Sequence, residues 1–353
     1  MSNLLKQTPL ATAVKYVTMC AATTALVTAA SLAQAIEFKA SGQVSRMIVA
    51  PDDAVGDEIQ FQDIGWSGSR FRFTGAQELA NGMEVGFRLE QQFRENSSGD
   101  TSGGDQVTDS GDNTDNRYQD IYFSGGFGKV AIGKGDGAGN GGTEVDLSGT
   151  ALSSSSNHQD NWGNYRITPT QTWDSIFTMQ DSLSRTNRLR YDTPAYSGFS
   201  FAASIGQGSA TELAARYSGN WGDTKFKAAL FVSDTADFGG LGTDTDIIGG
   251  SASLLLGGGI NITIAFSDVD PTGGLERDAQ TIKLGYKRGI HAYAIDFGEG
   301  TTGSEDADTV GLTYAAHVYK GIEIFGTYRQ LDSDKVAGAQ SIDIFAFGSR
   351  IKF

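Results

Sequence analysis

Hydrophobic and polar residues alternate along most of the chain, most clearly between positions 69 and 94. There, Phe71 and Phe73 alternate with Arg70 and Arg72. A repeat of two residues gives a β-strand one apolar face and one polar face. A soluble β-sandwich buries the apolar face, whereas a membrane barrel turns it toward lipid and lines a wet interior with charge. Arginines in the middle of a strand favour the barrel.

A tight turn divides this segment at Asn81 and Gly82, which both tolerate positive φ. After the turn, Val85, Phe87 and Leu89 share one face, and glutamates and an arginine occupy the other. The pattern therefore predicts a β-hairpin with an apolar outer face.

The same alternation recurs to the C-terminus, with short turns such as Arg288-Gly289 separated by longer acidic loops. We count about 16 strands, with boundaries accurate to a few residues. The fold class is therefore all-β, a transmembrane antiparallel β-barrel, and about 16 strands leave an aqueous lumen. In the first strand, 37–49, strict alternation puts Arg46 on the lipid face, so a bulge or a position at the rim is expected.

Three runs of residues are similar to sequences of the general porins of Gram-negative outer membranes. Positions 69–90 (SRFRFTGAQELANGMEVGFRLE) resemble the second hairpin of that family. Positions 117–134 (RYQDIYFSGGFGKVAIGK) and 185–194 (RTNRLRYDTP) resemble two further signatures. The resemblance implies a homotrimer in the outer membrane of a Gram-negative bacterium, in contact with lipid, and it implies no cofactor.

The N-terminus, residues 1–35, has the features of a secretory signal peptide. Lys6 and Lys15 supply positive charge, an apolar stretch follows, and positions 33–35 form an A-x-A cleavage site. The barrel is then expected to comprise residues 36–353.

The last strand ends at Phe353, preceded by further aromatic residues of the same parity. A terminal phenylalanine on an amphipathic strand resembles the signal by which outer-membrane proteins are recognised for assembly. We therefore expect Phe353 to serve as an assembly signal.

Composition narrows the classes of function. After the N-terminus there is no apolar run of about 18 residues, which argues against a bundle of membrane helices. The formal net charge of −15 argues against nucleic acid as a partner. The only cysteine, Cys20, lies in the predicted leader, so no disulfide scaffold or cysteine metal site is expected. The polar segment 96–116 lacks EF-hand spacing and is interpreted as a solvated loop without a metal.

Residues 135–184 form the longest stretch without strand periodicity, and long loops of this kind are commonly functional. Its position after the fifth predicted strand matches the porin loop that folds into the barrel, so we expect a constriction loop rather than an ordinary extracellular loop. The acids expected on it are Asp136, Glu144, Asp146 and Asp160. The basic wall expected around the constriction comprises Arg70, Arg72, Arg88, Arg117, Lys134 and Arg185.

Opposed charges across a narrow passage create a transverse field that polar solutes can follow. The favoured function is therefore passive diffusion of small hydrophilic solutes and ions. A substrate-selective channel of the same fold, with a binding site at the long loop, is the alternative. An outer-membrane enzyme would need a nucleophile held beside a base, and none of the three histidines, His158, His291 and His317, lies in such a context. A purely structural barrel is disfavoured by the arginines at mid-strand.

Overall fold

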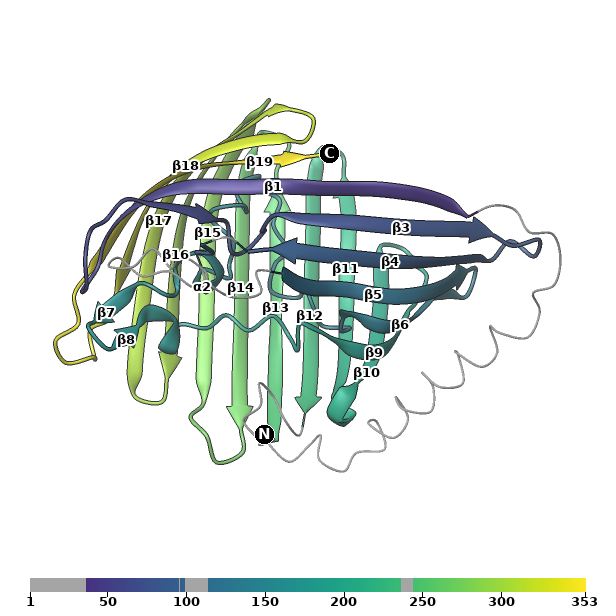
Figure 1. Ribbon diagram of the computed structural model, residues 1–353, viewed down its shortest axis with the longest axis horizontal. Helices are drawn as coiled ribbons and strands as arrows, with labels where there is room; N and C mark the ends of the chain where they lie inside the picture. The colour runs from purple at the N-terminus through teal and green to yellow at the C-terminus, as the bar shows by residue number, and fades with distance from the viewer. Residues whose placement is uncertain (1–35, 95, 99–113, 236–243) are drawn as a thin grey trace.

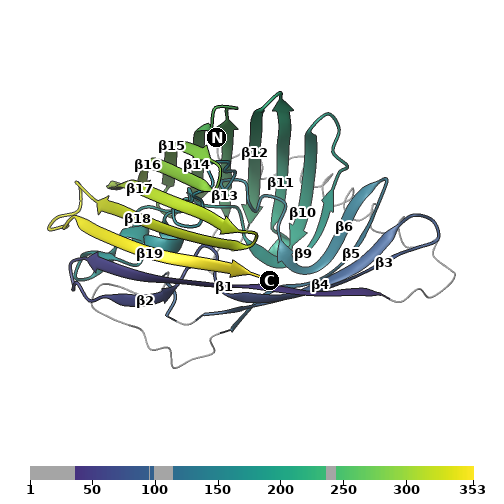
Figure 2. The ribbon, with the colours of Figure 1, turned by 90° about the horizontal axis from the view of Figure 1, so that it is seen from above.

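The computed structural model describes residues 36–94, 96–98, 114–235 and 244–353. The predicted signal peptide, and most of the polar segment 96–116, lie outside the described residues. The strands form one antiparallel sheet that closes on itself, because β1 pairs with β19 at one edge and with β2 and β3 at the other. Figure 1 shows the strands from the side of β1, and Figure 2 shows how they surround an interior.

The first barrel strands are β1 (Glu37–Asp52), β2 (Gln60–Asp63), β3 (Arg70–Glu78), β4 (Glu84–Phe93), β5 (Thr114–Gly125), β6 (Gly128–Asp136) and β9 (Arg185–Asp192). They continue with β10 (Phe199–Gly206), β11 (Thr211–Trp221), β12 (Thr224–Thr235), β13 (Thr245–Leu255) and β14 (Ile260–Pro271). The last are β15 (Arg277–Arg288), β16 (His291–Thr302), β17 (Glu305–Tyr319), β18 (Ile322–Asp332) and β19 (Ile342–Lys352).

The barrel has 16 strand positions, because β2 and β3 lie end to end along β1 and count as one. This confirms the predicted all-β architecture and the predicted number of strands. Among the described residues, no helix is long and apolar enough to cross a membrane.

The two faces of each strand differ as the sequence predicts. In β14, Ile262 and Ile264 are 40% and 51% exposed, whereas Asn261 and Thr263, which alternate with them, are 0% and 5% exposed. An apolar face open to the surroundings, with polar side chains packed inside, is the reverse of a soluble sheet and is typical of a barrel in lipid.

The hairpin between β3 and β4 forms as predicted. Phe73 lies opposite Leu89, and Gly82 in the turn has φ +77. Arg46, in contrast, was expected at a bulge or at the rim. The register of β1 against β19 is continuous from Gln43 to Asp52, so Arg46 stays on the outer face, where it forms an ion pair with Asp63 at 3.4 Å.

The segment between β6 and β9 carries local structure that the sequence did not predict. It contains the short helix α2 (Gln159–Trp162), the hairpin of β7 (Arg166–Thr168) and β8 (Gln171–Thr172), and the 3₁₀ turn η1 (Trp173–Ser175). A second 3₁₀ turn, η2 (Gln207–Ser209), joins β10 to β11. We call residues 137–184 the inner loop, because its backbone and side chains pack against the inward face of the barrel.

Serines on the inward face fix the backbone of the inner loop. The amide nitrogens of Ala138, Val145, Leu147 and Gln180 donate hydrogen bonds of 2.8–2.9 Å to Ser204, Ser251, Ser253 and Ser267 respectively. These bonds satisfy backbone donors that would otherwise be buried without a partner.

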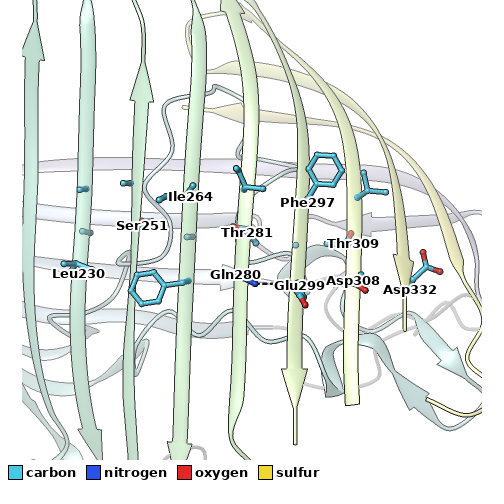
Figure 3. Close-up of a pocket in the computed structure, with 18 residues that line it drawn as sticks. Leu230, Ser251, Ile264, Gln280, Thr281, Phe297, Glu299, Asp308, Thr309 and Asp332 are labelled. Atoms are coloured by element: carbon cyan, nitrogen blue, oxygen red, sulfur yellow. Dashed lines mark hydrogen bonds between the residues drawn. The ribbon is translucent and has the colours of Figure 1, made fainter. Parts of the chain in front are cut away.

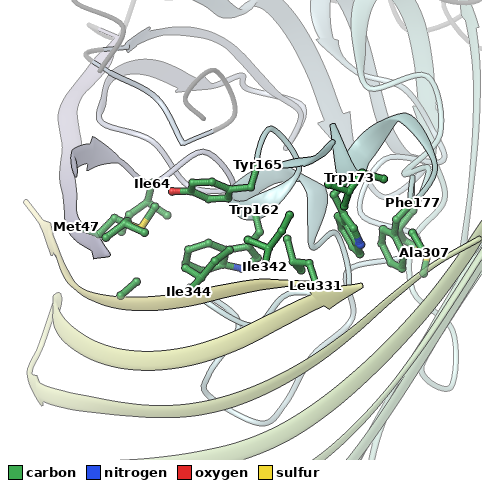
Figure 4. Packing of buried hydrophobic residues seen from close by; sticks show 14 of the residues in the cluster. Met47, Ile64, Trp162, Tyr165, Trp173, Phe177, Ala307, Leu331, Ile342 and Ile344 are labelled. Carbon is green, nitrogen blue, oxygen red and sulfur yellow. The ribbon is translucent and has the colours of Figure 1, made fainter. Parts of the chain in front are cut away.

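Apolar side chains complete the packing of the inner loop against the wall. Trp162, Tyr165 and Trp173 are at most 1% exposed and belong to one cluster with Ile342 and Ile344 of β19 (Figure 4). Trp173 also stacks on Phe177, with 4.4 Å between ring centroids. A barrel of this size would otherwise have a wide lumen, and this cluster fills one side of it.

Buried charges tie the inner loop to β15, β16 and β18. Lys283 Nζ lies 2.6 Å from Asp146 Oδ2 and also donates to the Ser154 carbonyl. Ser154 Oγ donates to Asp296 Oδ2 at 2.6 Å, and Arg329 Nη2 lies 2.6 Å from Asp296 Oδ1. We call these five residues the anchor cluster. Each charge in it has an opposite partner, as buried charges require.

The anchor cluster predicts a specific defect in Asp296→Asn. The substitution leaves Arg329 and Lys283 with one carboxylate between them, so we expect the packing of the inner loop to lose about 3 kcal/mol. After folding into lipid vesicles, the fluorescence of Trp162 and Trp173 should shift to the red at lower urea concentration than in the parent protein.

The matched control is Asp278→Asn, which changes an exposed aspartate on the outer face of β15. It should leave the fluorescence midpoint unchanged. Equal midpoints for Asp296→Asn and the parent protein would contradict the anchoring role.

Candidate functional site: charged passage inside the barrel

Arginines of neighbouring strands converge on Glu90, whose side chain is fully buried. Arg72 Nε lies 2.5 Å from Glu90 Oε2, and Arg117 Nε lies 2.8 Å from Glu90 Oε1. Arg70 Nη1 is 3.7 Å from the same Oε1 atom, and Arg117 Nη1 also donates to Gln92 at 2.6 Å. One carboxylate on β4 therefore serves three guanidinium groups from the inward faces of β3 and β5.

Asp120 is a second carboxylate that pairs with more than one arginine. Arg88 Nη2 lies 3.1 Å and Arg188 Nη2 lies 2.7 Å from Asp120 Oδ2. The guanidinium carbon of Arg88 lies 3.5 Å from the centroid of the Tyr118 ring, a cation–π contact. These contacts hold the arginine heads in defined positions.

The wall continues onto β6 and β9. Asp136, the last residue of β6, accepts a 2.6 Å hydrogen bond from the Tyr118 hydroxyl and lies 3.2 Å from Arg185 Nε. Arg190 pairs with Asp192 at 2.7 Å. Seven arginines on β3, β4, β5 and β9 thus share the carboxylates of Glu90, Asp120, Asp136 and Asp192. We call this set the arginine wall, and it retains excess positive charge.

A β-bulge in β5 explains how two successive residues join the arginine wall. Glu90 lies opposite Tyr118, but Gln91 lies opposite Asn116, so the register skips Arg117. An extra residue in one strand lets adjacent side chains turn to the same side. Arg117 and Tyr118 therefore both face the lumen, and simple alternation fails here.

The inner loop presents carboxylates toward the arginine wall. The Glu144 Oε1 atom accepts a 3.3 Å hydrogen bond from Trp66 Nε1. Burial, together with the neighbouring carboxylates of Asp181 and Asp160, raises the pKa of Glu144 to about 8. Burial and Asp181 raise the pKa of Asp160 to about 7, although the wall arginines act in the opposite direction.

A cavity of about 440 Å³ separates the two sets of charges. We call it the charged passage. Its acidic side consists of Glu144, Asp160, Asp174 and Asp181, and its basic side consists of Arg94, Arg117 and Arg185. Trp66, Gln92 and Met179 are also among the residues that line it.

The predicted site residues fall into two groups, those that line the charged passage and those that lie in the arginine wall beside it. Arg117, Arg185, Glu144 and Asp160 line the charged passage. Arg70, Arg72 and Arg88 belong to the arginine wall beside it. Asp136 also belongs to the wall, because it ends β6 and is not part of the loop.

Two predicted site residues lie elsewhere. Asp146 was expected to face the arginines but is paired with Lys283 in the anchor cluster. Lys134 lies opposite Gln119 and Asn187, which are both exposed, and it shares the outer face with Ile132. This facing follows simple alternation with Ile132, so the expectation that Lys134 faces the lumen departed from the pattern of its own strand.

Trp66 reaches the charged passage because one barrel strand is interrupted. Residues 64–69 separate β2 from β3 and turn inward, where the Trp66 amide donates to Asn161 Oδ1 at 3.0 Å. A Cβ atom on Gly65 would lie 1.9 Å from the Asp160 carbonyl oxygen, so only glycine allows this approach. No feature of the sequence indicated the break.

Sequence reasoning also missed Glu90 and Asp120 as the centres of the arginine wall. Both lie on the polar face of their strands, which is the signal that could have identified them. Phe353 lies on the outer face, 61% exposed, and its ring is 5.8 Å from that of Phe71. Its role in assembly stays a prediction.

A second hollow, of about 960 Å³, lies on the outside of the barrel over β12–β18 (Figure 3). Leu230, Ile264 and Phe297 line it and are about half exposed, and Glu299 and Asp308 lie toward one end. Because its apolar side chains share the outward face, it belongs to the lipid-facing surface and is separate from the charged passage.

Solved structures of outer-membrane proteins share this fold. The anion-selective porin from Comamonas acidovorans is 18% identical, with a TM-score of 0.64 over 90% of this chain and 100% of that one. A trimer form of OmpT from Vibrio cholerae is 15% identical, with a TM-score of 0.58 over 91% and 100%. The channel DcaP of Acinetobacter baumannii is 12% identical, with a TM-score of 0.59 over 92% and 100%.

No curated protein sequence matches the chain. The family model for Gram-negative porins, which are outer-membrane channels, matches residues 22–336, which is most of the sequence. Together with the closed barrel and its charged interior, this match shows that the chain belongs to the Gram-negative porin family.

Proposed function

We propose that ions and small hydrophilic solutes cross this outer-membrane diffusion channel through the charged passage, and that the inner loop constricts the lumen there. The observation that supports this most directly is the cavity itself, with loop carboxylates on one side and wall arginines on the other. The anchor cluster and the serine hydrogen bonds hold the inner loop against strands on the side of the barrel away from the arginine wall. The part of the lumen that the loop leaves open therefore borders the arginine wall.

The charged groups on the two sides of the passage differ in whether they form ion pairs. The guanidinium groups of the arginine wall are fixed by ion pairs, whereas within the described part of the chain no ion pair involves the carboxylates of Glu144 and Asp160. Fixed dipoles and charges in a narrow space strengthen the field that a passing solute meets. The passage should therefore admit hydrated, polar solutes and disfavour apolar ones, which gain nothing from that field.

The test is single-channel recording of the purified protein in a planar bilayer. A diffusion channel should show large, ohmic steps that are open most of the time. Small steps that one class of solute blocks at low concentration would favour the substrate-selective alternative, and a complete lack of conductance would overturn the proposal.

The histidines give no support to a catalytic role. His158 is buried near Asp296, His291 pairs with the Tyr314 hydroxyl, and His317 lies 3.0 Å from the Gly149 carbonyl oxygen. In the described ranges none of them contacts a serine or threonine hydroxyl, the arrangement that an activated nucleophile would need. We therefore propose that the protein acts only as a channel.

A homotrimer is the proposed assembly, with β1 and its neighbours at the subunit contact. Arg46 lies among the outward-facing Val44 and Ile48 of β1 and pairs with Asp63. A charge at mid-strand is costly against lipid but is tolerated against a protein partner. One solved relative is described as a trimer, which is consistent with this face being covered by another copy.

The proposed trimer predicts a mass of three copies for the protein in mild detergent, measured by light scattering with the detergent contribution subtracted. Arg46→Glu places two acids side by side on the proposed contact and should shift the mass toward monomers. Arg288→Glu, on the outer face of β15, is the matched control and should leave the trimer intact. A monomeric parent protein would contradict the assembly.

The arginine wall predicts the effect of the double variant Arg70→Ser, Arg72→Ser. It removes two positive charges and two partners of Glu90, so the lumen beside the passage should widen and the cation-to-anion permeability ratio should rise about fivefold, given ~1 kcal/mol for a solvated charge. Reversal potentials in a KCl gradient measure the ratio. The control Arg288→Ser changes an exposed arginine outside the lumen, and equal potentials in all three proteins would remove Arg70 and Arg72 from the ion path.

The raised pKa values of Glu144 and Asp160 predict that selectivity depends on pH. Both groups bind protons below their pKa values of about 8 and about 7, and both become anionic above them. Cation preference should therefore increase as the pH rises from 6 to 9.

Among the described residues, the other charged groups that face the passage are Asp174, Asp181, Arg94, Arg117 and Arg185. The arginines keep their charge across that range. Reversal potentials measured at each pH should lose this dependence in the double variant Glu144→Gln, Asp160→Asn. A pH dependence that persists in the variant would assign it to other groups.

A further inference from the structure

We propose that the hollow on the outside of the barrel, over β12–β18, binds one lipid molecule whose headgroup carries an ammonium group. The acyl chain lies in the apolar part of the hollow, and the ammonium group lies between the carboxylates of Glu299 and Asp308 (Figure 3). The site is on the lipid-facing surface, so it is independent of the charged passage and of the solutes that cross it.

The apolar part of the hollow owes its depth to small side chains. Ala228 of β12 lies directly opposite Ala252 of β13, and Ala252 lies directly opposite Ile264 of β14. Larger side chains, among them Leu230 and Phe297, border these alanines. The volume of about 960 Å³ is in the range of ~300–1,000 Å³ that ligand sites in proteins occupy. An alkyl chain can therefore contact side chains of several strands at once, which a flat outer face does not allow.

Carboxylates stand side by side at one end of the hollow. Glu299 of β16 lies directly opposite Asp308 of β17, and Asp308 lies directly opposite Asp332 of β18. Side chains in such pairs have Cβ atoms ~5 Å apart, and like charges directly opposite each other are destabilising. Gln280 donates a 2.9 Å hydrogen bond to Glu299 but brings no charge. A bound cation would relieve the repulsion along this row.

The protein itself leaves these carboxylates without a counter-charge. Within the described segments, no ion pair joins Glu299, Asp308 or Asp332 to a lysine or an arginine. Lys335, in the loop after β18, pairs with Asp306 at 2.9 Å instead. A positively charged headgroup is therefore the complement that this end of the hollow lacks.

The row also lies at the level of a lipid headgroup. Glu299 is close to the end of β16 at Thr302, and Asp308 is close to the start of β17 at Glu305. Charged side chains on the lipid face are costly at the bilayer midplane but cost little near the interface. One step further from the strand ends, the outward pair is Phe297 and Val310, which are apolar. The hollow thus changes from apolar to charged along the strands, as a lipid molecule does along its length.

A primary ammonium group suits the row better than other headgroups. It has three N–H donors, so it can bind both Glu299 and Asp308 while it neutralises charge. Hydrogen bonds between a cation and a carboxylate are stronger than those between neutral groups. An anionic headgroup is repelled by the row unless a divalent cation lies between them, and the test below separates that case.

The test is native mass spectrometry of the purified protein in mild detergent with EDTA. The protein is titrated with phosphatidylethanolamine or with phosphatidylglycerol of the same acyl chains. Both lipids carry a phosphate, but only the first carries an ammonium group. The dissociation constant of the first bound molecule should be about fivefold lower for phosphatidylethanolamine, the effect of one solvated ion pair.

Variants probe the two parts of the site. Glu299→Gln with Asp308→Asn should bring the two dissociation constants together. The matched control, Glu78→Gln with Asp223→Asn, changes exposed acids outside the hollow and should keep the fivefold difference. Ala252→Phe fills the apolar part and should weaken the binding of both lipids alike.

Three results would overturn the site. The first is an equal dissociation constant for the two lipids in the parent protein. The second is a preference for phosphatidylethanolamine that survives in the Glu299 and Asp308 variant. The third is a preference for phosphatidylglycerol that appears with Mg²⁺ and disappears with EDTA, because it would assign the row to a cation bridge to phosphate. The conductance in KCl should equal that of the parent protein in the Glu299, Asp308 and Ala252 variants, since these side chains face away from the lumen.

Discussion

The structure depends on how the positive charge of the lumen is held. Seven arginines point inward from β3, β4, β5 and β9, and four carboxylates serve all of them. Buried charges are tolerated only with partners, so Glu90 and Asp120 set where the arginine heads can lie. Because the carboxylates are shared, the wall remains positive. The carboxylates on the opposite side of the passage therefore face a surface with net positive charge.

The inner loop must also find partners for its buried polar groups, and it does so through the serines and charged residues of the barrel. Its polar backbone and apolar side chains must both find partners inside a barrel that would otherwise be filled with water. The serines of β10, β13 and β14 accept its amides, and Trp162 and Trp173 pack on the far wall. Asp146 and Ser154 then bind the charged residues of the anchor cluster. Glu144 and Asp160 remain on the side of the passage that faces the arginines, together with Asp174 and Asp181.

Local alternation was sufficient to predict the barrel, its number of strands and the hairpin at Gly82, because each depends on neighbouring residues. The position of the inner loop also followed from the absence of periodicity. Prediction failed where the direction of a side chain, toward the lumen or toward lipid, depends on how the strands pair. The bulge at Arg117 changes the face of a side chain, and the break between β2 and β3 turns Trp66 inward, but neither changes the alternation pattern. The pairing of Asp146 with Lys283 joins residues 137 positions apart, which no local pattern encodes.

These departures from regularity coincide with the passage. The bulge brings Arg117 and Tyr118 to the lumen together, and the break in the second strand brings Trp66 there. In a barrel in lipid, an interrupted ladder exposes backbone groups that must be satisfied within the protein. Gln43 and Ser69 supply partners at the break, through bonds to Ser67, Gly68 and the Ser45 amide. The barrel therefore stays closed, and its strands are irregular only where polar side chains meet the open lumen.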